Sequence, residues 1–266
     1  MLDTQYLRPA HLQDAAAAAR EGAKFLAGGQ TLLASMKLGL AMPPALADLQ
    51  GIEQLHNITA TADSLVAGAM VKHARMATDP IVQRLIPALA GLAGGIGDRQ
   101  VRAMGTIGGS VANNDPAACY PAALLALDAT VHTSKRSIAS KEYFQGLFAT
   151  ALEEDEIIAN IEFPVPRRAA YVKFRHPASR FALIGVFVAD TRSGPRVAVT
   201  GSGNGVFRHP GLEAALAQDF SVDAIRHVAV NEKDMGADQH ASAAYRAHLL
   251  KVVAGRAIAA LQDGGQ

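Results

Sequence analysis

Two glycine-rich segments constrain the fold of this chain more than any other feature. The longer, residues 105–116, sets the adjacent glycines Gly108 and Gly109 among hydroxyl, amide and carboxylate side chains. Adjacent glycines allow φ > 0 and bring backbone N–H groups within reach of an anion. An apolar helical run over 122–127 follows, and a helix N-terminus near the turn would favour negative charge. The segment is expected to be a turn that binds a phosphate-bearing ligand, although a lone Gly-Gly is more often a tight packing turn.

The shorter segment, residues 25–33, supports the ligand-binding interpretation. An apolar, strand-like stretch leads into Gly28-Gly29, and Leu32 and Leu33 then open a run with helical spacing. A strand, a glycine turn and a helix start form the usual geometry of a phosphate site, but neither segment contains a P-loop or a G-x-G-x-x-G motif. Together they indicate a less common dinucleotide-binding fold.

Length, charge and cysteine content exclude several classes of protein. The 266 residues are 50% hydrophobic, enough for one large domain or two ordinary ones. With 25 basic and 24 acidic residues, the chain lacks the excess of positive charge that is typical of nucleic-acid-binding proteins. No run is long enough to span a membrane and the first residues lack a signal peptide, so a cytoplasmic protein is expected. The single cysteine, Cys119, can form neither an intrachain disulfide nor an iron–sulfur site, and no metal-binding or hydrolase motif occurs.

Hydrophobic periodicity predicts an α+β arrangement. In the first part of the chain, helices are expected over 11–20, 31–40, 72–78 and 82–92. Strands are expected there over 24–27, 45–49, 64–70, 129–133 and 156–163. The glycine-dense stretch 91–105 is expected to be irregular, and the acidic run 153–156 to be a solvated turn.

A change of composition at Pro164, Pro166 and Arg167-Arg168 places a domain boundary after residue 166. This divides the chain into domains 1–166 and 167–266. Strands are predicted in the second domain over 171–175, 181–190 and 196–200. Helices are predicted there over 211–218, 221–228 and 241–261.

The glycine motifs carry a family resemblance. A-G-G-Q-T-L at 27–32 and T-I-G-G-S at 106–110 resemble the signatures of the FAD-binding medium subunit of molybdenum hydroxylases, the family of the carbon monoxide dehydrogenase medium chain and the xanthine dehydrogenase flavin domain. Further matching stretches are 68–73, 96–102, 121–128, 155–164 and 242–249. The resemblance implies an FAD-binding domain of the p-cresol methylhydroxylase type (PCMH-type) with two α/β subdomains. A small C-terminal domain with a three-stranded antiparallel sheet and a helical bundle would follow it.

The resemblance also implies a function. The chain would be an oxidoreductase subunit that carries FAD, takes electrons from a small [2Fe–2S] subunit and passes them to an external acceptor. Substrate would be oxidised on a large molybdenum-cofactor subunit, in a dimer of heterotrimers, and no catalytic or metal-binding residue is assigned to this chain. Two alternatives are a self-sufficient flavin oxidase of the same superfamily and an FAD-free scaffold. A flavin spectrum and turnover by the isolated chain separate them.

The cofactor-binding residues implied by the resemblance come from both motifs and from four later positions. Asp115 would serve the adenosine side, and Ile158 and Lys173 the isoalloxazine side, where a lysine stabilises the anionic reduced flavin. Gly108→Val is expected to abolish FAD binding while leaving most of the fold intact. The full set is Phe25, Leu26, Ala27, Gly28, Gly29, Gln30, Thr31, Leu32, Thr106, Ile107, Gly108, Gly109, Ser110, Asp115, Cys119, Ile158 and Lys173.

Four positions depart from the family pattern. Many members have an acidic residue that contacts adenosine where this chain has Cys119, for which a small buried hydrophobe is the favoured interpretation. Either Asp115 makes that contact or the contact is missing. Val71 replaces a hydroxyl residue, Ala103 an asparagine, and Arg180 an acidic residue. The loop 176–180 is therefore expected to be specialised, controlling access of the acceptor.

Overall fold

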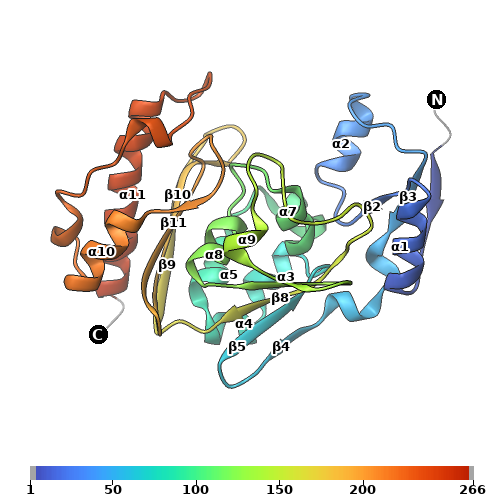
Figure 1. The fold of residues 1–266 in the computed structure, drawn as a ribbon, viewed down its shortest axis with the longest axis horizontal. Helices are drawn as coiled ribbons and strands as arrows, with labels where there is room; N and C mark the ends of the chain where they lie inside the picture. The colour runs from blue at the N-terminus through green and yellow to red at the C-terminus, as the bar shows by residue number, and fades with distance from the viewer. Residues whose placement is uncertain (1–3, 264–266) are drawn as a thin grey trace.

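The computed structural model describes residues 4–263, in which three β-sheets lie side by side with helices packed between and around them (Figure 1). The first lobe, at the right of Figure 1, contains a small parallel sheet with strand order β1-β3-β2. Helices return the chain between these strands, as parallel pairing requires. The elements of the lobe are β1 (Gln5–Leu7), α1 (Leu12–Arg20), β2 (Lys24–Leu26), α2 (Leu32–Lys37) and β3 (Ala45–Asp48).

The second lobe is built on a five-stranded antiparallel sheet with order β4-β5-β8-β6-β7. Its helix α8 is apolar all round, and all seven of its residues are buried, as expected of a helix in the middle of a core. The strands are β4 (Ile58–Ala60), β5 (Ser64–Gly68), β6 (Thr130–Thr133), β7 (Ser137–Ala139) and β8 (Ile158–Pro164). The helices are α3 (His73–Thr78), α4 (Pro80–Leu85), α5 (Pro87–Gly94), α6 (Arg99–Met104), α7 (Ile107–Asn113), α8 (Tyr120–Ala126) and α9 (Ser140–Tyr143).

The C-terminal region forms an antiparallel sheet with order β12-β11-β10-β9, covered on its outer face by two helices (Figure 1). Its elements are β9 (Arg168–Arg175), β10 (Ala182–Thr191), β11 (Gly194–Thr200), β12 (Phe207–Arg208), α10 (Pro210–Gln218) and α11 (Ala243–Asp263). The three predicted strands are thus present and antiparallel. A two-residue fourth strand, β12, extends the sheet beyond the prediction.

Strand β10 shows how this sheet joins two hydrophobic cores. Side chains alternate between the faces of a strand. Ile184 and Val186 pack into a core with α10 and α11, whereas Phe187 and Ala189 pack into the core of the second lobe. One sheet therefore holds the helical layer on one face and the second-lobe helices α5 and α8 on the other.

Several elements differ from the sequence prediction. The stretch predicted to be irregular contains helix α6, because Asp98 caps its start by accepting from the Val101 N–H at 2.8 Å. Residues 221–228 form only a short 3₁₀ turn, Asp223–Ile225, rather than an α-helix. Helix α11 begins at Ala243, two residues later than predicted. Strands β1, β4 and β7 were not predicted, being only three residues long.

Candidate functional site

The two glycine motifs lie in different lobes of the chain and meet at their interface. A Cβ placed on Gly28 would lie 2.3 Å from the carbonyl oxygen of Met104, so only glycine allows the first turn to approach the end of α6. A Cβ on Gly109 would lie 3.3 Å from that of Ala27. The fold therefore brings together two segments about eighty residues apart. This contact is the core of the candidate site.

The first motif has the predicted strand, turn and helix geometry. Strand β2 ends at Leu26, and α2 begins at Leu32. Gly29 between them has φ 70°, in the left-handed region that favours glycine. Within residues 4–263, the N–H groups of residues 28–31 donate to no backbone carbonyl. Successive free N–H groups around a left-handed residue form a concave anion site.

The second motif is not the predicted turn. Its glycines lie in helix α7, and neither has a positive φ. The N–H of Ile107 donates to the Val71 carbonyl at 3.0 Å and that of Gly108 to Ala69 at 2.8 Å, and the N–H of Gly109 donates to Thr106 Oγ1 at 3.1 Å. These N–H groups are therefore occupied. They are thus not free donors in this structure, and the cofactor-binding role expected of this motif stays a prediction.

Close packing explains why α7 needs glycine. A Cβ on Gly108 would lie 2.5 Å from that of Ala69 and 2.7 Å from the Ala69 carbonyl oxygen, at the end of β5. A valine at this position would therefore collide with the chain's own backbone rather than only with a ligand. This corrects the expectation that Gly108→Val leaves most of the fold intact. The group that the motif still presents is the hydroxyl of the partly exposed Ser110, because Thr106 is buried and its hydroxyl caps α7.

The buried residue His73 packs against the start of the second motif. Its backbone N–H donates to the Gly105 carbonyl at 2.9 Å, and its ring Nδ1 lies 3.2 Å from the Tyr120 hydroxyl. Burial, and then the charge of Arg102, lowers the pKa of His73 to about 4, so the ring is neutral near pH 7. His73 thus has a structural role, with a tyrosine hydroxyl as its partner. Arg102 donates to the carbonyls of Ile96 and Gly97 and so holds its own loop together.

The segment after α7 is fixed by side-chain hydrogen bonds. Asp115 Oδ1 accepts from the N–H of Ala117 at 2.8 Å, which is the local Asx-turn that the sequence allowed. Asn114 has φ 43° and ends α7; its Nδ2 donates to two carbonyls of the loop 144–150, each at 2.8 Å. That loop presents the exposed Leu147 and Phe148. Sequence reasoning missed it, although an asparagine just after a helix is a signal for a left-handed C-cap.

Two of the later predicted positions, Cys119 and Lys173, are brought together. Cys119 is 5% exposed, which confirms that it is buried. Lys173, on β9, donates through Nζ to Cys119 Sγ at 3.3 Å and to the Arg180 carbonyl at 3.1 Å. Arg180, in the loop expected to be specialised, has φ 63°. Ile158 is 4% exposed and lies in the core at the start of β8. The isoalloxazine roles of Ile158 and Lys173 stay predictions.

The acidic run 153–156 contains the expected turn, with Glu153 and Glu154 exposed, but Asp155 and Glu156 also enter a network of ion pairs. Glu156 is 2% exposed and accepts from Arg136 Nε and Nη2, both at 3.0 Å. Asp155 accepts from Lys135 and, at 2.9 Å, from Arg20 on α1. The hydrogen bond from Lys135, and then that from Arg20, lowers the pKa of Asp155. Carboxylates satisfied in this way bind no metal, and the described residues contain no cluster suited to one.

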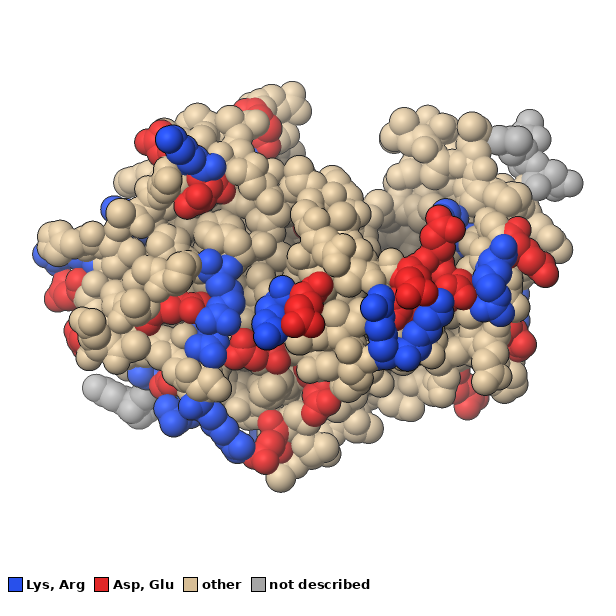
Figure 2. All heavy atoms as spheres, viewed as in Figure 1, with Lys and Arg blue, Asp and Glu red and all other residues tan. Residues whose placement is uncertain are grey.

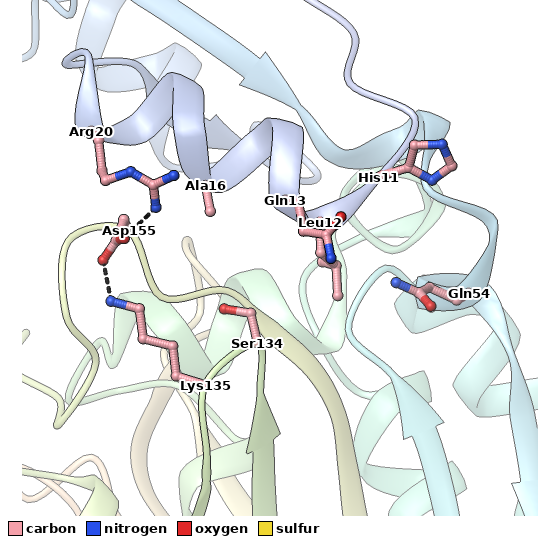
Figure 3. A pocket seen from close by; sticks show the side chains of 9 residues that line it. All are labelled: His11, Leu12, Gln13, Ala16, Arg20, Gln54, Ser134, Lys135 and Asp155. Atoms are coloured by element: carbon pink, nitrogen blue, oxygen red, sulfur yellow. Dashed lines mark hydrogen bonds and ion pairs between the residues drawn. The ribbon is translucent and has the colours of Figure 1, made fainter.

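A cavity of about 460 Å³ lies beside this network, between α1 and the turn after β6 (Figure 3). Figure 2 shows acidic and basic side chains lying next to one another over this face of the molecule. None of its lining residues belongs to either glycine motif, so the cavity is separate from the candidate site. The lining residues are His11, Leu12, Gln13, Ala16, Arg20, Gln54, Ser134, Lys135 and Asp155.

Taken together, the two lobes and the open glycine turn are the arrangement expected of a protein that holds a phosphate-bearing cofactor between lobes. Residues 2–166 match the family described as the FAD binding domain in molybdopterin dehydrogenase. The chain belongs to this family. It is an oxidoreductase subunit of the medium-chain type, with FAD as its cofactor.

Relatives match over nearly the whole chain. The nicotine 6-hydroxylase medium subunit of Paenarthrobacter nicotinovorans is 32% identical over 96% of this chain and 95% of its own length. The carbon monoxide dehydrogenase medium chain of Hydrogenophaga pseudoflava is 33% identical over 78% of this chain and 77% of its own. A solved structure of that carbon monoxide dehydrogenase, lacking the Mo-pyranopterin moiety, superimposes with a TM-score of 0.90 at 30% identity, covering 98% of this chain and 97% of the other. The predicted resemblance and fold class are confirmed. Of residues 4–263, no helix has the length and apolarity needed to cross a membrane.

Proposed function

We propose that this chain is the electron-transfer subunit of a molybdenum hydroxylase complex, passing electrons from a [2Fe–2S] subunit through FAD to an external acceptor. Several similar proteins are named as medium chains or medium subunits, which supports a place in a multi-subunit enzyme. The proposal includes a large molybdenum-cofactor partner, a dimer of heterotrimers, a cytoplasmic location and a domain boundary after residue 166.

The observation that carries the proposal is the free row of N–H groups at residues 28–31, docked against the second motif. A diphosphate is the part of FAD that such a row would hold, because it offers several acceptor oxygens and negative charge. The Gly29 conformation sets the N–H directions before any ligand arrives. The residues present therefore fit the cofactor.

The other predicted site residues support specific parts of the same cofactor. Thr106 and Ser110 would add hydroxyl donors from the facing motif. Asp115 would serve the adenosine end, with its loop already ordered by its own Asx-turn. FAD, when bound, supplies the redox chemistry, taking single electrons and delivering pairs. The protein's part is to bind it, orient it and set its electrostatic surroundings.

The direct test is a titration of the purified chain with FAD, followed by absorbance. We expect about one equivalent to bind. Gly29→Asp should weaken binding by more than tenfold, because it places a carboxylate in the anion site while aspartate tolerates the left-handed conformation. Gly39→Asp is the matched control: Gly39 has φ 71° with no atom within 4 Å of its Cβ position, and it lies outside the motif. Equal affinity in all three proteins would contradict the proposed site.

The assembly is tested separately, by co-expression with the iron–sulfur and molybdenum subunits. Reduction of FAD by substrate only in the three-subunit complex would support the electron-transfer role. Turnover by the isolated chain would instead identify a self-sufficient oxidase. Failure to bind FAD even with the partners present would identify a scaffold.

A further inference from the structure

The pair Cys119 and Lys173 joins the FAD domain to the C-terminal sheet. Cys119 stands at the start of α8, and Lys173 extends from β9 with its Nζ 3.3 Å from the sulfur. A second hydrogen bond to the Arg180 carbonyl at 3.1 Å fixes the amine in this position. Two nucleophilic atoms are thus held in contact across the boundary between two layers of the molecule.

We propose that Cys119 and Lys173 form a reversible covalent cross-link, a sulfenamide, when Cys119 is oxidised by a peroxide. An oxidised cysteine usually condenses with a neighbouring thiol or nitrogen. This chain contains no second cysteine, so no intrachain disulfide competes. The Lys173 amine is the nitrogen in hydrogen-bond contact with the sulfur. This proposal rests on that contact and not on the proposed electron-transfer function.

The surroundings of the sulfur suit an oxidised intermediate. The Tyr171 hydroxyl is buried close to Cys119, with no partner of normal hydrogen-bond geometry among the described residues; burial, and then the nearby Cys119, raises its pKa. A buried hydroxyl without a partner is a donor available to a new oxygen. A sulfenic acid on Cys119 would supply that oxygen. Tyr171 would then hold the intermediate while the amine attacks.

A route for a small oxidant exists on the same side. A cavity of about 210 Å³ lies between α5 and β9, and both Lys173 and Tyr171 line it. The remaining lining residues are Gly91, Leu92, Gly95, Val172 and Arg175. Hydrogen peroxide is little larger than water and would fit in a space of this size. Cys119 is 5% exposed and does not line the cavity, so the peroxide would reach the sulfur past Lys173 and Tyr171.

The chemistry balances in two steps. Hydrogen peroxide transfers one oxygen to the Cys119 thiol, which becomes a sulfenic acid as one water leaves. The unprotonated amine of Lys173 then attacks the sulfur; an S–N bond forms, the S–O bond breaks, and hydroxide leaves with a proton from nitrogen as a second water. Sulfur is oxidised by two electrons and the peroxide is reduced by two. Two equivalents of an external thiol reverse the link, becoming a disulfide as Cys119 and Lys173 are restored.

The link would have two effects on the molecule. It ties β9 to the start of α8, so the C-terminal sheet can no longer move relative to the FAD domain. It also removes the positive charge of Lys173, because a sulfenamide nitrogen is not protonated near pH 7. The pair therefore acts as a peroxide-sensitive lock.

The test uses the full chain treated with hydrogen peroxide, digested and analysed by mass spectrometry. We expect a peptide pair joined through Cys119 and Lys173, lighter by two hydrogens than the sum of its parts and separated by dithiothreitol. Lys173→Arg should abolish the pair, since a guanidinium keeps the charge but is a poor nucleophile. Lys141→Arg, at an exposed lysine on α9, should leave the yield unchanged. Circular dichroism of each variant checks that it is folded.

Two results would overturn the proposal. One is conversion of Cys119 to sulfinic acid at the same rate in the wild type and in Lys173→Arg, with no joined peptides in either. The other is a joined pair that persists in Lys173→Arg through a different nitrogen. The cross-link must form in the wild-type chain. Its absence there would contradict the proposal even if a variant failed to fold.

Discussion

The two glycine motifs look alike in sequence but perform different physical tasks. In the first, Gly29 adopts a left-handed conformation and the neighbouring N–H groups stay free. In the second, Gly108 is helical, its N–H is bonded to Ala69, and its missing side chain makes room for β5. One glycine pair thus leaves a row of backbone N–H groups free, and the other lets a helix pack closely against the end of β5.

The difference shows that a Gly-Gly pair in a sequence indicates a conformational or packing constraint, but does not distinguish between the two. Glycine is required either for a positive φ or for close approach, and the same two letters encode both. A substitution at each motif should therefore fail in a different way. A substitution in the second motif should lower the free energy of unfolding, and a substitution in the first should weaken FAD binding.

The largest effect is expected from Gly108→Ala. Its new methyl group would lie 2.5 Å from the Ala69 side chain, so the backbone of α7 or β5 must shift. Overpacking of this kind costs about 3 kcal/mol of unfolding free energy. Urea denaturation measures it. Gly91→Ala is the matched control, since Gly91 is also helical but has nothing within 4 Å. That control should gain roughly 0.5–1 kcal/mol.

A different pattern would break the comparison. Suppose Gly108→Ala keeps full stability and loses only FAD affinity. Gly108 would then face the ligand, as the sequence alone indicated, and the two motifs would perform the same task after all.

The second prediction concerns His73, which supports the second motif. Its pKa is about 4 in the folded chain against 6.5 normally, so between these values only the unfolded chain binds the proton. Stability is therefore lost as the pH falls from about 6.5 to 4, by roughly 3 kcal/mol in total. Unfolding free energies of wild type and His73→Gln, measured across this range, should converge as the pH falls. His209, whose pKa is also lowered by burial, contributes equally to both proteins and cancels.

A constant difference between the two proteins from pH 7 to pH 4 would contradict this prediction. It would mean that His73 keeps its ordinary pKa of 6.5 when folded and is therefore protonated in the folded chain at lower pH. The ring would then carry a positive charge beside the second motif, and His73 would itself be a candidate for contact with the diphosphate.

Much of this molecule could be predicted from the sequence, but not the task of each glycine. Elements α1, β10 and α11 were predicted from hydrophobic periodicity, because the burial of one face or of the whole element determines where apolar residues occur. Helix α7 was missed because its residues are poor helix formers, and tertiary bonds to Val71 and Ala69 override that preference.

Contacts between distant residues were equally hidden. The approach of Gly28 to Met104 depends on how two lobes dock, and no local pattern records it. The same holds for the contact of Lys173 with Cys119, which are fifty-four residues apart. The family resemblance identified Lys173 and Cys119 as site residues, but their contact with each other is seen only in the folded structure.

A smaller effect is expected from Gly29→Ala. Alanine in the left-handed region costs about 1–2 kcal/mol, and its methyl group would meet only the flexible end of Leu33. If the strain is relieved by moving the turn, FAD affinity should fall about tenfold, which corresponds to about 1.4 kcal/mol. Gly39→Ala, with the same φ outside the motif, should show similar strain and unchanged affinity. Equal affinity losses in both variants would show that the effect is general instability.

The smallest effect is expected where an ion pair joins the two lobes. Arg20 on α1 donates to Asp155 at 2.9 Å, but the arginine side chain is 61% exposed. An exposed pair is screened by water and salt and contributes little to stability. Arg20→Gln should therefore change neither the urea midpoint nor FAD affinity measurably, at low or high salt. A clear loss of affinity that salt reproduces in the wild type would show that this ion pair, and not the backbone contact of Gly28 with Met104, holds the two motifs together.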